Sequence, residues 1–166
     1  TIAHLLGRRL KYPVYDSDQY IESSTGVDIP LIFELEGESG FREREAKALR
    51  ELTEREQIIL STGGGAILTS ENRRLLANKG IVIYLQISPE EQYRRLKGDR
   101  SRPLIQTTDP LERLKELALE RNALYQEVAD ITIKVDGRTP TEILEILLSK
   151  IHKFDKLALR DHKSIN

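Results

Sequence analysis

The sequence predicts an α/β fold built around a parallel sheet. Short apolar runs rich in Val, Ile and Leu alternate with segments that carry helix start signals. Continuous β-branched runs are typical of strands buried on both faces of a sheet, and the helices between them supply the crossovers that parallel strands require. At 166 residues the chain has the size of one domain with one core.

The expected strands are four short apolar runs. They cover residues 14–15, 58–60, 81–85 and 131–135. Helical spacing and capping residues predict the helices between them. These helices cover residues 1–10, 19–25 (ended by Gly26), 28–36 and 41–53, one begins near residue 70, and three more begin at residues 88, 109 and 139. Residues 17–53 therefore insert several charged helices between the first two strands.

The last three helices share one start signal. Each begins with a capping residue, a proline in the first turn and a glutamate three residues after the cap, as in a capping box. The three starts are 88–91 (Ser-Pro-Glu-Glu), 109–112 (Asp-Pro-Leu-Glu) and 139–142 (Thr-Pro-Thr-Glu).

Two segments show no regular pattern of strands or helices. Residues 97–109 form a polar loop suited to a mobile lid, and beyond Lys153 we expect a polar, frayed tail.

Composition excludes several functional classes. The chain has 26 basic and 27 acidic residues, a net charge of -1, which argues against general electrostatic binding of nucleic acid. It has no cysteine, so disulfides and thiolate metal sites are excluded and a cytosolic location is permitted. We expect no membrane span, because no apolar run approaches about 20 residues, and no signal peptide.

The first binding signal is the glycine turn at Gly63, Gly64 and Gly65, directly after the strand at 58–60. Three glycines add no packing and cost conformational entropy, so this strand end needs bare backbone. Open α/β sheets bind small polar ligands at the carboxyl ends of their strands. The turn therefore predicts a site for a small anionic or hydroxylated molecule.

A pair of aspartates marks the end of the first strand. Asp16 and Asp18 are alternate residues, so both carboxylates can face one crevice. Such a pair can hold Mg²⁺ through water or accept a proton from a hydroxyl group. The alternative is a solvated turn in which one aspartate caps the following helix.

Three arginines complete the set of polar residues with a possible role in binding. Arg42 lies in an acidic segment, Arg102 in the polar loop and Arg121 in the long helix. Arginine can grip a carboxylate or a phosphate with two parallel hydrogen bonds. The alternative for each is a solvated surface charge paired with a glutamate.

Five segments, in order, resemble shikimate kinases. They are 15–18 (Tyr-Asp-Ser-Asp), 32–45 (with Gly40-Phe41-Arg42 and Glu45), 62–65 (Thr-Gly-Gly-Gly), 102–104 (Arg-Pro-Leu) and 121–125 (Arg-Asn-Ala-Leu-Tyr). The resemblance spans about residues 1–151. It implies a P-loop, nucleoside-monophosphate-kinase-like fold with three α/β/α layers and a parallel sheet. Residues 1–166 would form one kinase domain, with a substrate-binding insertion at 17–45, a lid at 97–109 and a C-terminal tail at 152–166.

The same resemblance implies transfer of the γ-phosphate of ATP to the 3-hydroxyl of shikimate. The product, shikimate 3-phosphate, leads to chorismate and the aromatic amino acids. The expected cofactors are ATP and Mg²⁺, and the expected form is a cytoplasmic monomer with no nucleic-acid or membrane partner.

Site roles are carried over residue by residue. Asp18 would bind shikimate hydroxyls and orient or deprotonate the 3-hydroxyl, while Arg102 would stabilise the transferring phosphoryl group. The other substrate-binding residues would be Arg42 and Arg121 on the carboxylate, Glu45 supporting Arg42, Gly63, Gly64 and Gly65 on the ring hydroxyls, and Phe33 and Phe41 walling the pocket. The nucleotide would contact Thr1, Arg102 and Arg138, and Asp16 would reach Mg²⁺ through water.

The sequence departs from the family pattern in three places. The G-x-x-x-x-G-K-[ST] phosphate loop is absent, and so is the central first strand before it, with Thr1 matching the position just after the loop. The chain has no methionine and opens in helical register, so we expect about 15 to 20 further residues before Thr1 in the working protein. Ala123 replaces a usual proline, which we expect to loosen a turn at residues 124–125.

Two other functions fit the same residues. A kinase for another small sugar acid, such as gluconate, would lack a carboxylate clamp formed by both the insertion and the long helix. A non-catalytic binding module would keep a shikimate-like pocket without a phosphate loop.

Overall fold

The strands form two parallel pairs. In the computed structural model, which describes residues 1–97 and 108–163, β1 (Val14–Asp16) pairs with β2 (Ile59–Ser61), and β3 (Ile83–Gln86) pairs with β4 (Ile131–Lys134). Within these described ranges no hydrogen bonds join the two pairs.

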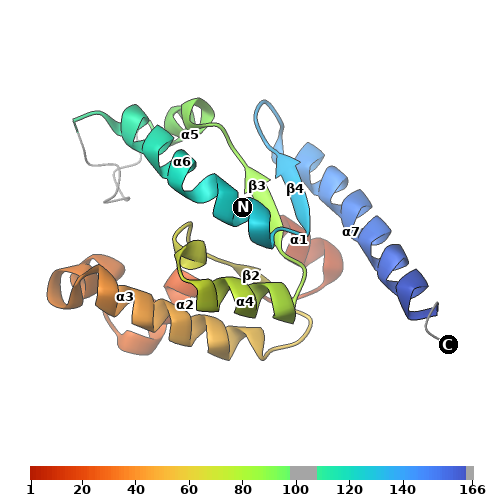
Figure 1. The fold of residues 1–166 in the computed structure, drawn as a ribbon, viewed down its shortest axis with the longest axis horizontal. Helices are drawn as coiled ribbons and strands as arrows, with labels where there is room; N and C mark the ends of the chain where they lie inside the picture. The colour runs from red at the N-terminus through yellow and green to blue at the C-terminus, as the bar shows by residue number, and fades with distance from the viewer. Residues whose placement is uncertain (98–107, 164–166) are drawn as a thin grey trace.

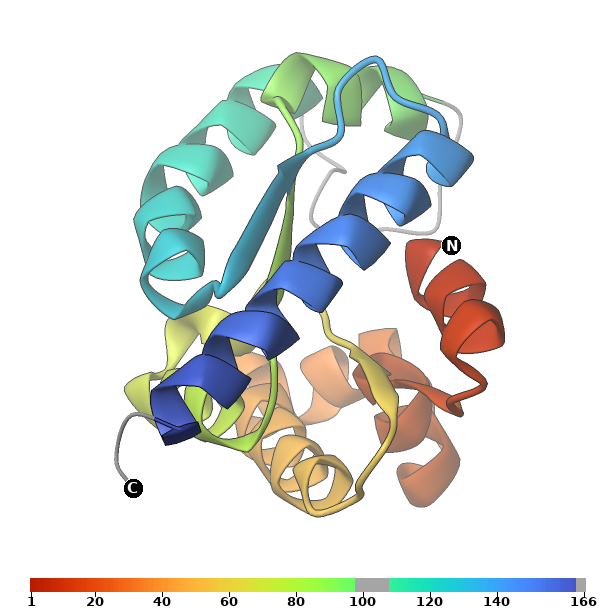
Figure 2. The ribbon, with the colours of Figure 1, turned by 90° about the vertical axis from the view of Figure 1, so that its right-hand side faces the viewer.

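Seven helices and one 3₁₀-helix complete the described part of the chain. They are α1 (Ile2–Leu10), α2 (Ser17–Thr25), α3 (Ile29–Thr53), η1 (Ala66–Leu68), α4 (Ser70–Lys79), α5 (Pro89–Leu96), α6 (Pro110–Val128) and α7 (Pro140–Lys163). Helix α6 lies on one side of the β3–β4 pair and α7 on the other (Figures 1 and 2). The predicted α/β/α layers are therefore confirmed.

One face of β4 forms the main core. Ile131 and Ile133 are buried against Leu6 of α1 and Leu147 of α7. Alternate residues of β4 are exposed, so the prediction that the strands are buried on both faces is wrong for this strand. The reason is that β4 packs its apolar side on α7, whereas in the part of the chain that the structure describes no helix makes a comparable contact with its other side.

Helix α3 merges two predicted helices. It begins at the predicted cap, where the carboxylate of Asp28 accepts the amide of Leu31 at 3.1 Å. Gly37 interrupts it with a φ of 70°, a left-handed conformation that favours glycine. The helices expected at 28–36 and 41–53 are thus two arms joined at this kink.

The predicted capping boxes differ in outcome. At α7 the box is complete, since Thr139 receives the amide of Glu142 at 3.3 Å and donates its own amide to the Glu142 carboxylate at 2.7 Å. At α5 only half forms. Ser88 accepts the amide of Glu91, but its own amide donates to Asp136, because the Glu91 carboxylate binds two arginines instead.

The C-terminal helix is longer than predicted. Instead of fraying beyond Lys153, α7 continues to Lys163. Its apolar face, including Ile151 and Phe154, still packs toward the main core at this point, which supports further helical turns. No helix in the described ranges is both long and apolar enough to cross a membrane.

Candidate active site

The glycine turn lies where β2 ends, and three side chains from other elements lie against it. A methyl group added at Gly63 would lie 3.4 Å from both carboxylate oxygens of Asp18. At Gly64 it would lie 3.3 Å from Nη1 of Arg121, and at Gly65 it would lie 2.5 Å from Nη1 of Arg42. The structure therefore brings an aspartate and two arginines from three helices together around bare backbone.

Strand register explains how Asp18 reaches this turn. Asp16 of β1 is the parallel partner of Ser61 of β2, so the two strands end side by side, and Asp18 in the first turn of α2 lies next to Gly63. Asp16 itself caps α2, because its Oδ1 accepts the amides of Asp18 at 2.9 Å and Gln19 at 3.1 Å. The capping alternative considered from sequence is thus correct for Asp16.

Helix α3 supplies Arg42 together with its acidic partners. Nη1 of Arg42 donates to Glu45 at 2.8 Å, and Nη2 donates to the exposed Glu38 at 3.4 Å. Glu45 is only 1% exposed, and this burial raises the pKa of its carboxyl group, although the charge and hydrogen bond of Arg42 oppose the rise. The predicted support of Arg42 by Glu45 is present as a direct contact.

The predicted aromatic residues stack next to this pair. The Phe33 and Phe41 rings are 4.8 Å apart between centroids, and the Arg42 guanidinium lies 5.2 Å from the Phe41 centroid. Phe41 is buried in a small cluster with Ile21 and Ile32. This cluster fixes the arm of α3 that carries Arg42.

Helix α6 supplies Arg121 and a residue that sequence analysis did not assign. The helix runs unbroken from Pro110 to Val128, which confirms the long helix predicted to start at residue 109, and alanine at position 123 favours this helix. Arg121 and Tyr125 are four residues apart and share one helix face. The Tyr125 hydroxyl donates to the Gly64 carbonyl at 2.6 Å. The one available signal for Tyr125 in the sequence was its position four residues after Arg121 on a predicted helix.

The electrostatics of the site favour an anion. Two guanidinium groups converge on the glycine turn, and their charges also act on nearby Glu45 and Tyr125. Among the described residues, the buried Nε atoms of Arg42 and Arg121 have no hydrogen-bond partner. Buried donors are costly when unsatisfied, so this arrangement suits a ligand with acceptor oxygens.

The residues predicted to bind nucleotide that the structure describes, Thr1 and Arg138, bond to residues near them in the sequence. Thr1 is exposed, with its hydroxyl 2.7 Å from Nδ1 of His4, and Arg138 donates to the Lys134 carbonyl at 3.0 Å in an exposed loop. Arg102 and most of the expected lid at 97–109 lie outside the described residues. Within residues 1–97 and 108–154, no group of three or more His, Asp or Glu side chains could by itself hold a metal ion.

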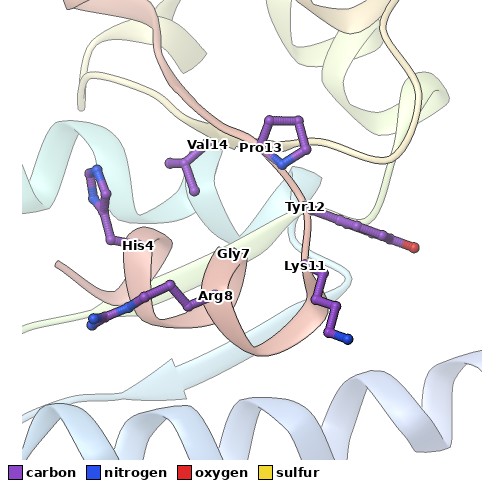
Figure 3. Close-up of a pocket in the computed structure, with 7 residues that line it drawn as sticks. All are labelled: His4, Gly7, Arg8, Lys11, Tyr12, Pro13 and Val14. Atoms are coloured by element: carbon purple, nitrogen blue, oxygen red, sulfur yellow. The ribbon is translucent and has the colours of Figure 1, made fainter.

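A cavity of about 740 Å³ opens elsewhere, between α1 and β1 (Figure 3). Its lining residues are His4, Gly7, Arg8, Lys11, Tyr12, Pro13 and Val14. None of the residues predicted to bind substrate contributes to it. The glycine turn and this cavity are therefore separate features of the molecule.

Fold and site together define a class: an α/β/α protein with an aspartate and two arginines grouped around bare backbone at the carboxyl edge of parallel strands. A family model described as shikimate kinase matches residues 1–152. The shikimate kinase of Nitrosococcus oceani is 54% identical over 142 residues, covering 86% of this chain and 74% of the relative. The enzyme of Bordetella pertussis is 49% identical over 156 residues, covering 94% of this chain and 74% of the relative.

Solved structures agree with the sequence relatives. A shikimate kinase from Acinetobacter baumannii in complex with shikimate superposes with a TM-score of 0.88 at 41% identity, covering 92% of this chain and 85% of the other. The shikimate kinase of Aquifex aeolicus superposes with a TM-score of 0.79 at 34% identity, covering 91% of this chain and 88% of the other. The chain belongs to the shikimate kinase family and is an ATP-dependent kinase.

Proposed function

We propose that this kinase transfers the γ-phosphate of ATP to the 3-hydroxyl of shikimate at the glycine turn. The observation that carries the proposal is the meeting of Arg42 from α3 and Arg121 from α6 at Gly64 and Gly65. A kinase for a substrate without a carboxylate would not need two guanidinium groups here. The complex of the Acinetobacter baumannii relative with shikimate supports the same substrate.

The two arginines would clamp the shikimate carboxylate. Each guanidinium offers two donors in a plane, which matches the two oxygens of a carboxylate. Glu45 holds Nη1 of Arg42, so the orientation of this guanidinium is set before substrate arrives. Glu38 also contacts Arg42, but at 3.4 Å from an exposed position, and the substrate acid can take its place.

Asp18 would act on the hydroxyl group that is phosphorylated. Its carboxylate lies beside Gly63, at the same edge as both arginines. A carboxylate there can accept the proton of the attacking hydroxyl and align its oxygen with the phosphorus atom. The amides of Gly63, Gly64 and Gly65 would donate to the other ring hydroxyls.

The remaining roles concern ATP and its metal ion. Both amide bonds to Asp16 go to Oδ1, so Oδ2 is available for a water of Mg²⁺, which prefers oxygen ligands and retains much of its hydration shell. When bound, the ion would neutralise charge on the phosphates. Thr1 and Arg138 would contact the nucleotide, and Arg102 of the lid at 97–109 would do so from outside the described residues. Because the chain lacks cysteine, it suits the reducing cytoplasm, where we expect a monomer.

The test is a coupled ADP-release assay on the full-length protein. Shikimate should stimulate ADP release, and gluconate added in excess should not compete. A shikimate analogue lacking the carboxylate should turn over poorly because it cannot engage the clamp. Turnover that is independent of shikimate, or equal for the analogue, would remove the proposal. Turnover with gluconate alone would favour the sugar-acid alternative.

A further inference from the structure

We propose that Tyr125 is a positioning residue that fixes the direction of the Gly65 amide in the substrate site. This inference rests on the proposed function, since the amide is taken to contact a ring hydroxyl of shikimate. Tyr125 itself need not touch the substrate. Its effect passes through the peptide bond between Gly64 and Gly65.

The glycine turn satisfies two of its three carbonyls by itself. Gly63 accepts the amide of Ala66 at 3.2 Å, and Gly65 accepts the amide of Leu68 at 3.1 Å. The middle carbonyl, on Gly64, accepts the hydroxyl of Tyr125 at 2.6 Å instead. The Gly64 carbonyl is therefore held by a hydrogen bond from helix α6, whereas the other two carbonyls are held by amides that follow in the chain.

Peptide geometry transmits this contact to the substrate side. In a planar trans peptide the carbonyl and the following N–H point in opposite directions. With the Gly64 carbonyl held toward Tyr125, the Gly65 N–H must point away from α6. This amide donates to none of the described residues, so it can donate to a substrate hydroxyl.

Tyr125 is itself held in place by its neighbours. Its ring stacks on Tyr84 of β3 with centroids 4.8 Å apart, and the Tyr84 hydroxyl donates to Asn122 at 3.0 Å. Burial raises the pKa of the Tyr125 phenol, opposed by the charge and the hydrogen bond of Arg121, so the hydroxyl keeps the proton that it donates. Strand β3 and helix α6 thus fix the donor that orients the turn.

The variant Tyr125→Phe tests the proposal, because it keeps the ring and its stacking but removes the donor. We expect the KM for shikimate to rise about five- to tenfold, the effect of losing one hydrogen bond, while the KM for ATP stays unchanged. The matched control is Tyr20→Phe on helix α2, which removes a hydroxyl bonded to the exposed Glu51 at 2.6 Å instead of to the glycine turn. It should leave both KM values as they are.

Deoxy substrates separate positioning from a general structural role. The 4-deoxy and 5-deoxy analogues of shikimate retain the 3-hydroxyl and can be phosphorylated. For the analogue lacking the hydroxyl that Gly65 contacts, wild type and Tyr125→Phe should have the same KM. An equal penalty for shikimate and both analogues, an equal effect of Tyr20→Phe, or an unchanged KM for shikimate would overturn the inference. Wild type that does not turn over shikimate would instead remove the proposed function, and this inference with it.

Discussion

Arg42 and Glu45, three residues apart on α3, form an ion pair of 2.8 Å in which the carboxylate is almost fully buried. Arg42 is also largely enclosed, with 16% of its side chain exposed. Buried charges stay ionised only when their partners are well placed, so each residue constrains the other. This pair sets the orientation of one half of the proposed carboxylate clamp.

Glu45 should make the stability of the fold depend on pH. Burial raises the pKa of Glu45 above its ordinary 4.5, so the folded state binds the proton more tightly than the unfolded state. Its contribution to stability is therefore greatest below pH 4.5 and falls as pH rises through the raised pKa. As pH rises from 4.5 through this raised pKa, the free energy of unfolding of wild type should fall relative to that of Glu45→Gln. Urea titrations at a series of pH values measure the difference, and a difference that rises with pH would contradict the account.

Removal of either clamp arginine should weaken substrate binding strongly. We expect Arg42→Ala and Arg121→Ala each to raise the Kd for shikimate by about 30-fold or more, since a buried charged contact is worth at least about 2 kcal/mol. Isothermal titration calorimetry measures this directly.

Each of these variants has a control on its own helix. Arg44 of α3 binds the exposed Glu36, and Arg113 of α6 binds the exposed Glu116. Arg44→Ala and Arg113→Ala should leave the Kd for shikimate unchanged. Equal losses in clamp and control variants would show that charge in general, and not the clamp, governs binding.

A side chain at Gly65 should displace Arg42. The added methyl group of Gly65→Ala would lie 2.5 Å from Nη1 of Arg42, so the guanidinium must move. We expect affinity for shikimate to fall about tenfold or more, equal to about 1.4 kcal/mol. Gly80→Ala is the control, since a methyl group there meets no atom within 4 Å. Unchanged affinity in Gly65→Ala would mean that the position of Arg42 does not matter for binding.

Glu91 should stabilise the fold at neutral pH and lose this effect in acid. Hydrogen bonds from Arg94 and Arg95 lower the pKa of Glu91 from 4.5 to about 2. Its contribution is therefore present above pH 4.5 and is lost as pH falls toward about 2. The stability difference between wild type and Glu91→Gln should shrink over this interval. NMR titration of the Glu91 carboxyl near its ordinary pKa would contradict this assignment.

Local chemistry made much of the fold predictable. The caps Asp28, Ser88 and Asp109 start helices where the sequence places them, because a side-chain acceptor before an apolar periodicity acts within a few residues. Pairing of Ser88 with Asp136 could not be predicted. These residues are 48 positions apart, and the contact exists only because the ends of β3 and β4 lie side by side.

Only part of the site could likewise be predicted from local sequence patterns. The strand-edge rule alone indicates that Asp18 and the glycines share one edge. Nothing local distinguishes Arg42 and Arg121 from the other basic residues, and only the family resemblance selected them. Tyr125 was missed because its partner is a backbone carbonyl, so the side-chain pattern held only its spacing of four residues from Arg121 and no sign of the contact itself.

The most direct test is a crystal structure of the full-length protein with shikimate bound. The account predicts that the substrate carboxylate accepts hydrogen bonds from both Arg42 and Arg121, with the ring above the glycine turn. A carboxylate that contacts neither arginine, or a substrate bound away from Gly63–65, would contradict it.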